Sequence, residues 1–253
     1  LIGGLTTEEI ARAYLAPEPT IAQRIVRAKK TIAEAHVPYE VPRGAELAER
    51  LGAVLGVIYL IFNEGYSATS GENWTRPQLC NDAIRLGRIL SGLMAREAEV
   101  HAMVALMEIQ ASRIGARSAP NGEPILLLDQ DRTKWDWTLI RHGLAALDRA
   151  EALRTRAGSY QLQAAIAACH ARARRADETD WHRIADLYDQ LAALTPSPVI
   201  ELNRAVAYGM AHGAEAGLQI TDELKEEPLL QQYHLLPSVR GDFLFKLGRL
   251  AEA

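Results

Sequence analysis

Polar and mostly cationic side chains recur at three- and four-residue intervals near the start of the chain, a spacing that places them on one side of an α-helix. A helix fits the major groove of duplex DNA, where Gln and Arg can pair with base edges and Lys with phosphates. The candidate DNA-contacting residues are Thr20, Gln23, Arg24, Arg27 and Lys30. On spacing alone, an ordinary helical hairpin with a solvated basic face explains the pattern equally well.

A second group of chemically capable residues lies in the string Asp129-Gln130-Asp131-Arg132-Thr133-Lys134-Trp135-Asp136. The structural interpretation is that Asp131 or Thr133 caps a helix running to Ala150. Arg132 would then pair with a carboxylate, and Trp135 would pack into the core. Caps and ion pairs are the commoner uses of such residues, so this interpretation is favoured.

Two functional interpretations compete for the same string. In the first, Arg132 and Trp135 anchor a contact with the DNA-binding segment or with a protein partner. In the second, the string is a metal or catalytic site. A calcium loop beginning at Asp129 would need glycine at Lys134 and glutamate at Ile140, and neither is present.

Other signals of catalysis are weak. The seven histidines include no His-Glu-x-x-His pair, and there is no phosphate loop and no Gly-x-Ser-x-Gly elbow. Cys80 and Cys169 are far apart in the chain, which argues against a disulfide scaffold or a zinc site. The sequence therefore predicts no enzyme activity, no cofactor and no metal.

The elements that would present the basic face form a helix, a tight turn and a second helix. Thr6 and Glu9 have the spacing of a capping box, which starts the first helix. Pro17 and Pro19 prevent that helix from continuing and are tolerated in the opening turn of the next. In the second helix a four-, three- and four-residue spacing predicts a shared buried face formed by Ile21, Ile25, Ala28 and Ile32.

The rest of the chain is predicted to be helical nearly throughout. Apolar periodicity predicts helices over 47–62, 79–93, 97–113, 139–150, 160–173, 181–191, 199–210 and 218–224. Residues 242–253 resemble the first helix of a tetratricopeptide repeat entering its second, in a repeat of about 34 residues. We expect an all-α fold: a helix-turn-helix followed by a tetratricopeptide-like right-handed solenoid or a bundle.

Four segments are predicted. Residues 1–36 form the helix-turn-helix, and residues 37–45, with two prolines and a glycine, form a linker. Residues 46–175 form a helical domain, and residues 176–253 form repeats whose last unit is incomplete. Because the chain does not begin with Met, we expect more of the DNA-binding protein upstream.

Composition bounds the partners and the location. The 253 residues are 48% hydrophobic, enough for a packed core, and carry a net charge of −4. Affinity for DNA must therefore be local to the basic helix. The longest apolar run, 51–62, is too short to span a membrane, and we expect a soluble, cytoplasmic protein.

The first helices also resemble region four of extracytoplasmic-function sigma factors. The resemblance is carried by Glu9-Ile10-Ala11, Glu18, Thr20-Ile21, Arg24-Ile25 and Arg27-Ala28-Lys29-Lys30. It implies that the second helix reads the −35 promoter element and that the domain docks on RNA polymerase. Leu15 stands where many such motifs place a glycine. Region two, which melts the −10 element, has no counterpart, so the chain alone would not initiate transcription.

The Asp129–Asp136 string, together with Phe62-Asn63-Glu64-Gly65-Tyr66, resembles the C-terminal extension of one sigma-factor group. That extension is tetratricopeptide-like and belongs to the regulatory apparatus, in place of an anti-sigma protein. The residues that carry this resemblance are Asn63, Glu64, Tyr66, Asp129, Gln130, Asp131, Arg132, Trp135 and Asp136.

The expected function is that of a fragment of an alternative bacterial sigma factor, with a helical domain that regulates or supports promoter recognition. The expected partners are the −35 element and the RNA polymerase core, and the extension could also contact the DNA-binding segment. No membrane partner is expected. The alternative is a helical-repeat scaffold for protein–protein interaction without DNA binding. A hydrolase in a helical cleft is a third option, but the sequence offers no carboxylate or histidine pair for it.

Overall fold

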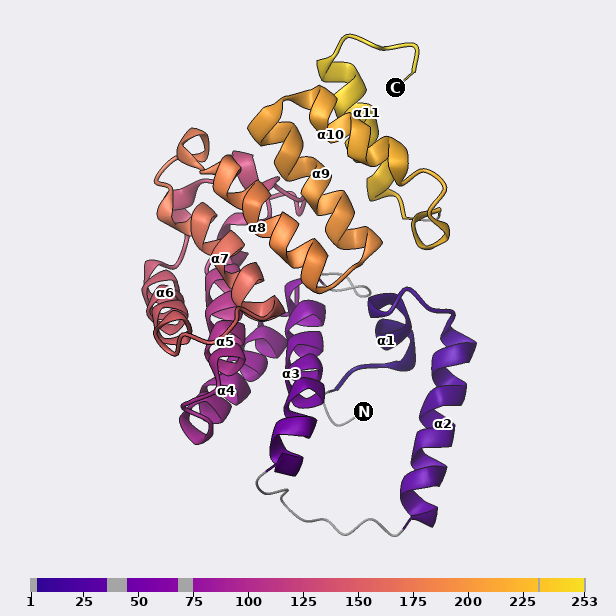
Figure 1. Ribbon diagram of the computed structural model, residues 1–253, viewed down its shortest axis with the longest axis vertical. Coiled ribbons are helices and arrows are strands. Elements are labelled where there is room, and N and C mark those ends of the chain that lie inside the picture. Colours follow the sequence, from indigo (N-terminus) through magenta and orange to yellow (C-terminus); the bar gives the residue numbers. More distant parts are fainter. Residues whose placement is uncertain (1–3, 36–44, 68–74, 232, 253) are drawn as a thin grey trace. The chain divides into compact units, whose positions relative to one another are not determined.

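The computed structural model describes residues 4–35, 45–67, 75–231 and 233–252, and the regular structure in these ranges is helical (Figure 1). The sole exception within them is an isolated bridge between Ser118 and Pro124. The predicted all-α fold is confirmed. The chain forms two compact units, Leu1–Met94 with Pro120–Glu123 and Ala95–Ala119 with Pro124–Ala253. The predicted domain boundaries stay a prediction.

The first unit consists of α1 (Thr7–Ala13), α2 (Glu18–Glu34), α3 (Ala45–Tyr66) and α4 (Pro77–Leu93), with α1 packed on α2 and α3 on α4. The two helices of the second pair approach closely at Gly65, whose carbonyl accepts from the Arg76 amide at 2.7 Å. A Cβ on Gly65 would lie 2.7 Å from the backbone nitrogen of Cys80. Residues 37–44 of the predicted linker lie outside the described residues.

The second unit begins with α5 (Ala98–Ala111), α6 (Trp137–Ala152) and α7 (Ser159–Arg172), and α5 packs on both of the others. The helix predicted over 97–113 is present as α5, but the single apolar face expected from its periodicity is wrong, because twelve residues of α5 are buried and none is exposed. Neighbouring helices come close enough to cover it. Gly143 of α6 permits this close approach, because a Cβ atom at this position would lie 2.7 Å from Cγ1 of Ile109.

The unit continues with α8 (Trp181–Leu194), α9 (Pro198–His212), α10 (Ala214–Glu223) and α11 (Leu235–Lys246), in which consecutive helices pack on one another (Figure 1). α8 and α10 begin 33 residues apart, close to a tetratricopeptide period of about 34. The Phe243 ring fills the space left by Gly209 and Gly217, whose Cβ atoms would lie within 2.4 Å of it. Short 3₁₀ turns, η1 to η5, are formed by Ile114–Ala116, Leu127–Asp129, Arg132–Lys134, Ala176–Glu178 and Pro228–Leu230.

The prediction of a helix over 242–253 is wrong in position, because α11 ends at Lys246. Gly248 has a φ of 74°, and the amides of Gly248 and Arg249 donate to the carbonyls of Phe245 and Leu244. This is a Schellman motif, and it stops the helix.

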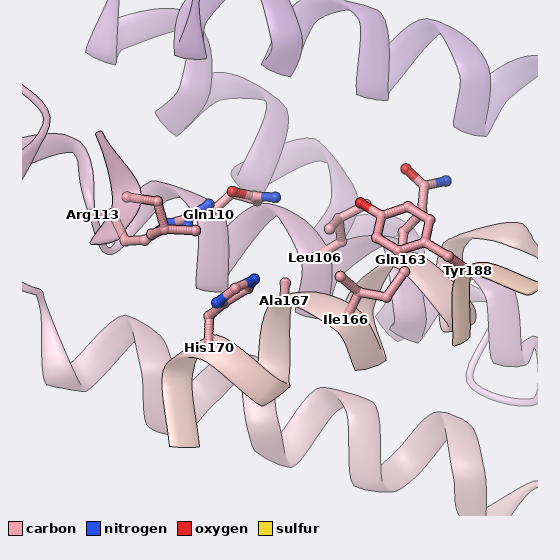
Figure 2. Close-up of a pocket in the computed structure, with 9 residues that line it drawn as sticks. Leu106, Gln110, Arg113, Gln163, Ile166, Ala167, His170 and Tyr188 are labelled. Carbon is pink, nitrogen blue, oxygen red and sulfur yellow. The ribbon is translucent and has the colours of Figure 1, made fainter. Parts of the chain in front are cut away.

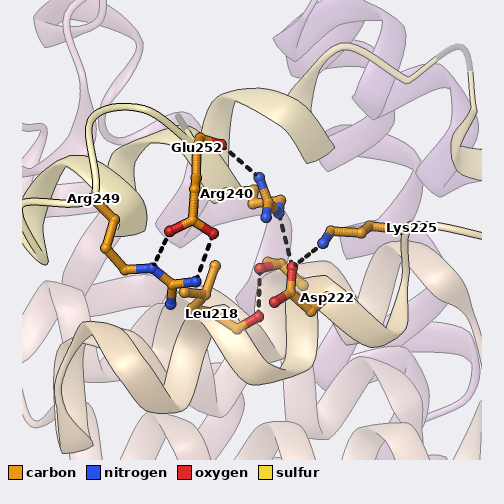
Figure 3. Close-up of polar contacts among 7 residues, drawn as sticks. Leu218, Asp222, Lys225, Arg240, Arg249 and Glu252 are labelled. Carbon is orange, nitrogen blue, oxygen red and sulfur yellow. Dashed lines mark hydrogen bonds and ion pairs between the residues drawn. The ribbon is translucent and has the colours of Figure 1, made fainter.

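Arg240 of α11 connects α10 with the segment that follows α11 (Figure 3). The Asp222 carboxylate accepts from Lys225 at 2.6 Å and from Arg240 at 2.8 Å. Arg249 and Glu252 form a bidentate pair at 2.8 Å, and Arg240 also donates to the Glu252 carbonyl. In the parts of the chain that the structure describes, no helix has both the length and the apolar character needed to cross a membrane.

We predict opposite effects from two Gly→Ala changes in α3. Gly65→Ala should lower the free energy of unfolding by about 1–3 kcal/mol, because its methyl group would collide with α4 backbone. Gly56→Ala should raise it by about 0.5–1 kcal/mol, since no atom lies within 4 Å of the added Cβ and alanine favours helix. Urea denaturation of both variants tests this. Equal effects would contradict the close approach at Gly65.

Candidate functional site

The helix-turn-helix has the predicted capping box. The Thr6 hydroxyl accepts from the Glu9 amide at 3.2 Å, and Glu9 Oε2 accepts from the Thr6 amide at 2.6 Å. The turn that follows α1 is also a Schellman motif, with Leu15 N–H donating to Arg12 and Ala16 N–H to Ala11. Leu15 has a φ of 48°. It thus adopts the left-handed conformation that the glycine of related motifs would supply at no steric cost.

The predicted apolar face of α2 is only partly buried. Ile21 is buried and Ile25 half-buried, as expected, but Ala28 and Ile32 are exposed, which corrects the sequence prediction. The reason is that α1 is much shorter than α2. α1 has seven residues and α2 has seventeen, so at 1.5 Å per residue α1 can cover only part of α2.

The predicted DNA-contacting side chains lie on accessible parts of α2. Gln23, Arg24, Arg27 and Lys30 are exposed and Thr20 is half-buried. Lys30 lies 3.6 Å from Glu34, an exposed pair that contributes little to stability. The basic face is therefore accessible to a partner.

In the Phe62–Tyr66 string, Glu64 is an ion-pairing residue. Its side chain is 5% exposed and lies 3.6 Å from Arg76, which also donates to buried Glu9 at 2.8 Å. A single guanidinium thus links α1 to α3 within the first unit. Asn63 is exposed and Tyr66 is half-buried, with its ring stacked on Phe62 at 5.7 Å.

The Asp129–Asp136 string is a loop fixed mainly by its own side chains. Asp131 accepts from the hydroxyl and amide of Thr133, and these bonds lower the pKa of Asp131. Asp136 accepts from the first amides of α6 at 2.8 and 3.1 Å. The predicted cap at Asp131 or Thr133 is therefore wrong, because Asp136 caps the helix running past Ala150 and Asp131 caps η3. Asp129 is exposed, whereas Gln130 is buried and donates to the Ile125 carbonyl.

Arg132 is the central residue of the string. It is buried and donates to the carbonyls of His170 and Ala173 at 2.7 and 2.6 Å, and to the Thr179 hydroxyl at 3.4 Å. These carbonyls lie at the C-terminal end of α7, where backbone acceptors have no helical partner. The predicted pairing with a carboxylate is wrong, because the described residues place none within 4.0 Å of Arg132.

Trp135 is 3% exposed, so its predicted place in the core is confirmed. Its ring lies beside two guanidinium groups, at 4.8 Å from Arg132 and 6.0 Å from Arg113. Burial lowers the pKa of Arg132, and the nearby charge of Arg113 lowers it further. The string therefore contributes to a buried cationic cluster.

His170 lies beside this cluster, with its ring 5.2 Å from Trp181 in an edge-on contact. Burial, followed by the charges of Arg113 and Arg132, lowers the pKa of His170 to about 4. The imidazole is therefore neutral at pH 7. In the residues that can be described, no three His, Cys, Asp or Glu side chains gather as metal ligands would.

The sequence reasoning missed Gln110, Arg113, His170 and Tyr188, which all line one cavity in the second unit. They come from α5, the turn after it, α7 and α8, with no shared motif or regular spacing. Isolated Arg and His residues on different helices give no sequence signal. These residues could not be predicted without knowing that α5 is buried on all sides.

A family model and a related bacterial protein match this chain. Residues 50–151 match a family model described as "Family of unknown function (DUF6596)". The chain is 47% identical, over all of its 253 residues, to an uncharacterized protein of Rhizobium meliloti (strain 1021), and it spans 59% of that relative's length. No solved structure matches it. The matched family region includes Glu64, Arg113, Arg132 and Trp135 but not α2.

We predict that Leu15→Gly stabilises the first unit. A left-handed non-glycine residue costs about 1–2 kcal/mol, and glycine loses about 0.5–1 kcal/mol of backbone entropy. The net gain in the free energy of unfolding should be about 0.5–1 kcal/mol, measured by thermal or urea denaturation. Leu15→Ala, which keeps the strain and loses little burial at this exposed position, is the control. A loss of stability in Leu15→Gly would contradict the prediction.

We predict that His170 makes stability depend on pH between about 4 and 6.5. The unfolded chain binds the proton near pH 6.5 and the folded chain near 4, so stability is full above 6.5 and falls as the pH falls toward 4. The loss due to His170 should be up to about 3 kcal/mol. His170→Gln should remove this component from the pH profile of urea unfolding. If the stability of the unmodified protein and that of His170→Gln changed with pH in the same way, the prediction would be refuted.

Proposed function

We propose that α2 reads the −35 element of promoter DNA as part of an alternative sigma factor, with the helical remainder regulating or supporting that activity. The observation that carries the proposal is the exposure of Gln23, Arg24 and Arg27 on a helix held at its start by α1. Base-pairing and phosphate-pairing side chains are thus available on one face. The resemblance of α1 and α2 to sigma region four supplies the −35 element as target and RNA polymerase as partner.

The local structure also supports the proposal. Recognition helices need a rigid approach angle, because their side chains must reach base edges in a groove. The capping box, the Schellman turn and the extended backbone of Pro17 before α2 fix the connection between the helices. Glu9, which completes the box, is also bound by Arg76. The second helix therefore starts from a well-defined turn.

Binding of fluorescent duplexes, measured by anisotropy over a range of KCl concentrations, tests this function. The logarithm of the affinity should fall linearly with the logarithm of the salt concentration, by about 0.9 for each phosphate neutralised. Lys30→Ala should reduce the slope by about 0.9 on every duplex. Gln23→Ala should reduce the preference for a −35-like sequence over a scrambled one and leave the slope unchanged.

Lys29→Ala is the matched control, because Lys29 lies on the opposite side of the same exposed helix and its replacement changes the charge equally. It should leave both slope and preference intact. Equal effects of Lys29→Ala and Lys30→Ala on the salt slope would show that the protein binds DNA only through nonspecific charge attraction. Absence of salt-dependent binding would favour the alternative, a helical-repeat scaffold.

A further inference from the structure

A cavity of about 180 Å³ lies in the second unit between α5, α7 and α8 (Figure 2). One end is polar and is formed by Gln110, Arg113 and His170. The other end is formed by Leu106, Ile166 and the ring of Tyr188, with the neutral amide of Gln163 beside them. The cationic side chain therefore lies at one end, whereas the other end combines aliphatic and aromatic side chains with one neutral amide.

The polar end contains three buried atoms that have no hydrogen-bond partner: Oε1 of Gln110, Nε of Arg113 and Nδ1 of His170. Arg113 and His170 are each 8% exposed. Buried polar atoms in folded proteins are nearly always paired, since leaving one unpaired costs about 1–3 kcal/mol. Three such atoms at one end of one cavity indicate that a bound group satisfies them.

The positive charge at the polar end of the cavity favours an anionic ligand. The Arg113 guanidinium has no carboxylate within 4.0 Å in the described part of the chain, and its cationic neighbour Arg132 binds only neutral oxygens. His170 adds a neutral ring that can donate through Nδ1. The Gln110 amide, turned over, presents its NH₂ group in place of Oε1. An anionic oxygen would therefore meet donors and an uncompensated positive charge.

The size and the apolar end limit the rest of the ligand. A cavity of about 150 Å³ holds benzene, so this one has room for roughly six to eight non-hydrogen atoms. The aliphatic side chains of Leu106 and Ile166 cannot hydrogen-bond to a second charged group of a ligand. They would instead cover a short hydrocarbon chain. Burial raises the pKa of Tyr188 to about 12, so its hydroxyl stays protonated and adds no negative charge.

We propose that this cavity binds a small organic carboxylate, with the carboxylate on Arg113, His170 and Gln110 and a short apolar chain between Leu106, Ile166 and Tyr188. A guanidinium such as that of Arg113 can hold both oxygens of a carboxylate through two parallel N–H groups. The site lies on residues other than those proposed to contact DNA, so the two proposals stand or fall separately.

Isothermal titration calorimetry of the whole chain with sodium butanoate, in a buffer without other carboxylates, tests the site. Butanoate should bind saturably. Butanamide, the neutral isostere, should bind at least tenfold more weakly, and inorganic phosphate should bind more weakly than butanoate. Absence of saturable heat with butanoate, equal affinity for butanamide, or tighter binding of phosphate would overturn the proposal.

Two variants test whether butanoate binds in this cavity. Arg113→Gln should weaken binding at least tenfold, whereas Arg141→Gln, which removes the same charge from the exposed face of α6, should leave it unchanged. Ala167→Met should block the cavity without changing charge, and far-ultraviolet circular dichroism reports whether each variant is folded. Butanoate binding that survives in folded Ala167→Met would overturn the site. Lys30→Ala should still bind butanoate, and Arg113→Gln should still bind DNA.

Discussion

The burial of α5 on every side is the constraint on which the second unit depends. A helix that is covered all round must be mainly apolar, and its neighbours must come close, as α6 does where Gly143 faces Ile109. The same packing leaves Arg113 only 8% exposed and Gln110 half-buried at the end of the helix. Gln110 and Arg113 therefore lie in a low-dielectric environment, where an unpaired atom is costly and an anion is strongly attracted.

α7 shows how charged side chains compensate for such burial. Its first amides donate to the Glu99 carboxylate at 2.9 and 3.1 Å, and its last carbonyls accept from Arg132. An anion at the N-terminus and a cation at the C-terminus both match the helix dipole. Arg132 donates to helix carbonyls rather than to a carboxylate, although the charges of Glu178 and Asp177 also act on it. The stack on Trp135 keeps the charge of Arg132 beside Arg113 and the cavity.

The parts of the structure that the sequence predicted are those encoded locally. The box at Thr6 and Glu9, the turn at Pro17 and the all-helical character rest on contacts a few residues apart. Features that depend on tertiary packing were missed. The periodicity of 97–113 does not reveal that both sides are covered. The spacing of Ala28 and Ile32 does not reveal that α1 is too short to cover them. Residues of the cavity, drawn from different helices, left no pattern at all.

The cations of this chain occupy two environments that suit different anions. Arg24, Arg27 and Lys30 are exposed, so salt screens them and each contributes little alone; several together suit an extended polyanion bound with strong salt dependence. Arg113 and Arg132 are buried, where screening is weak and space is limited. The cavity beside Arg113 has room for the proposed small anion but not for a DNA backbone. The two proposed sites should therefore differ in salt dependence, which is strong for the exposed face of α2 and weak for the cavity.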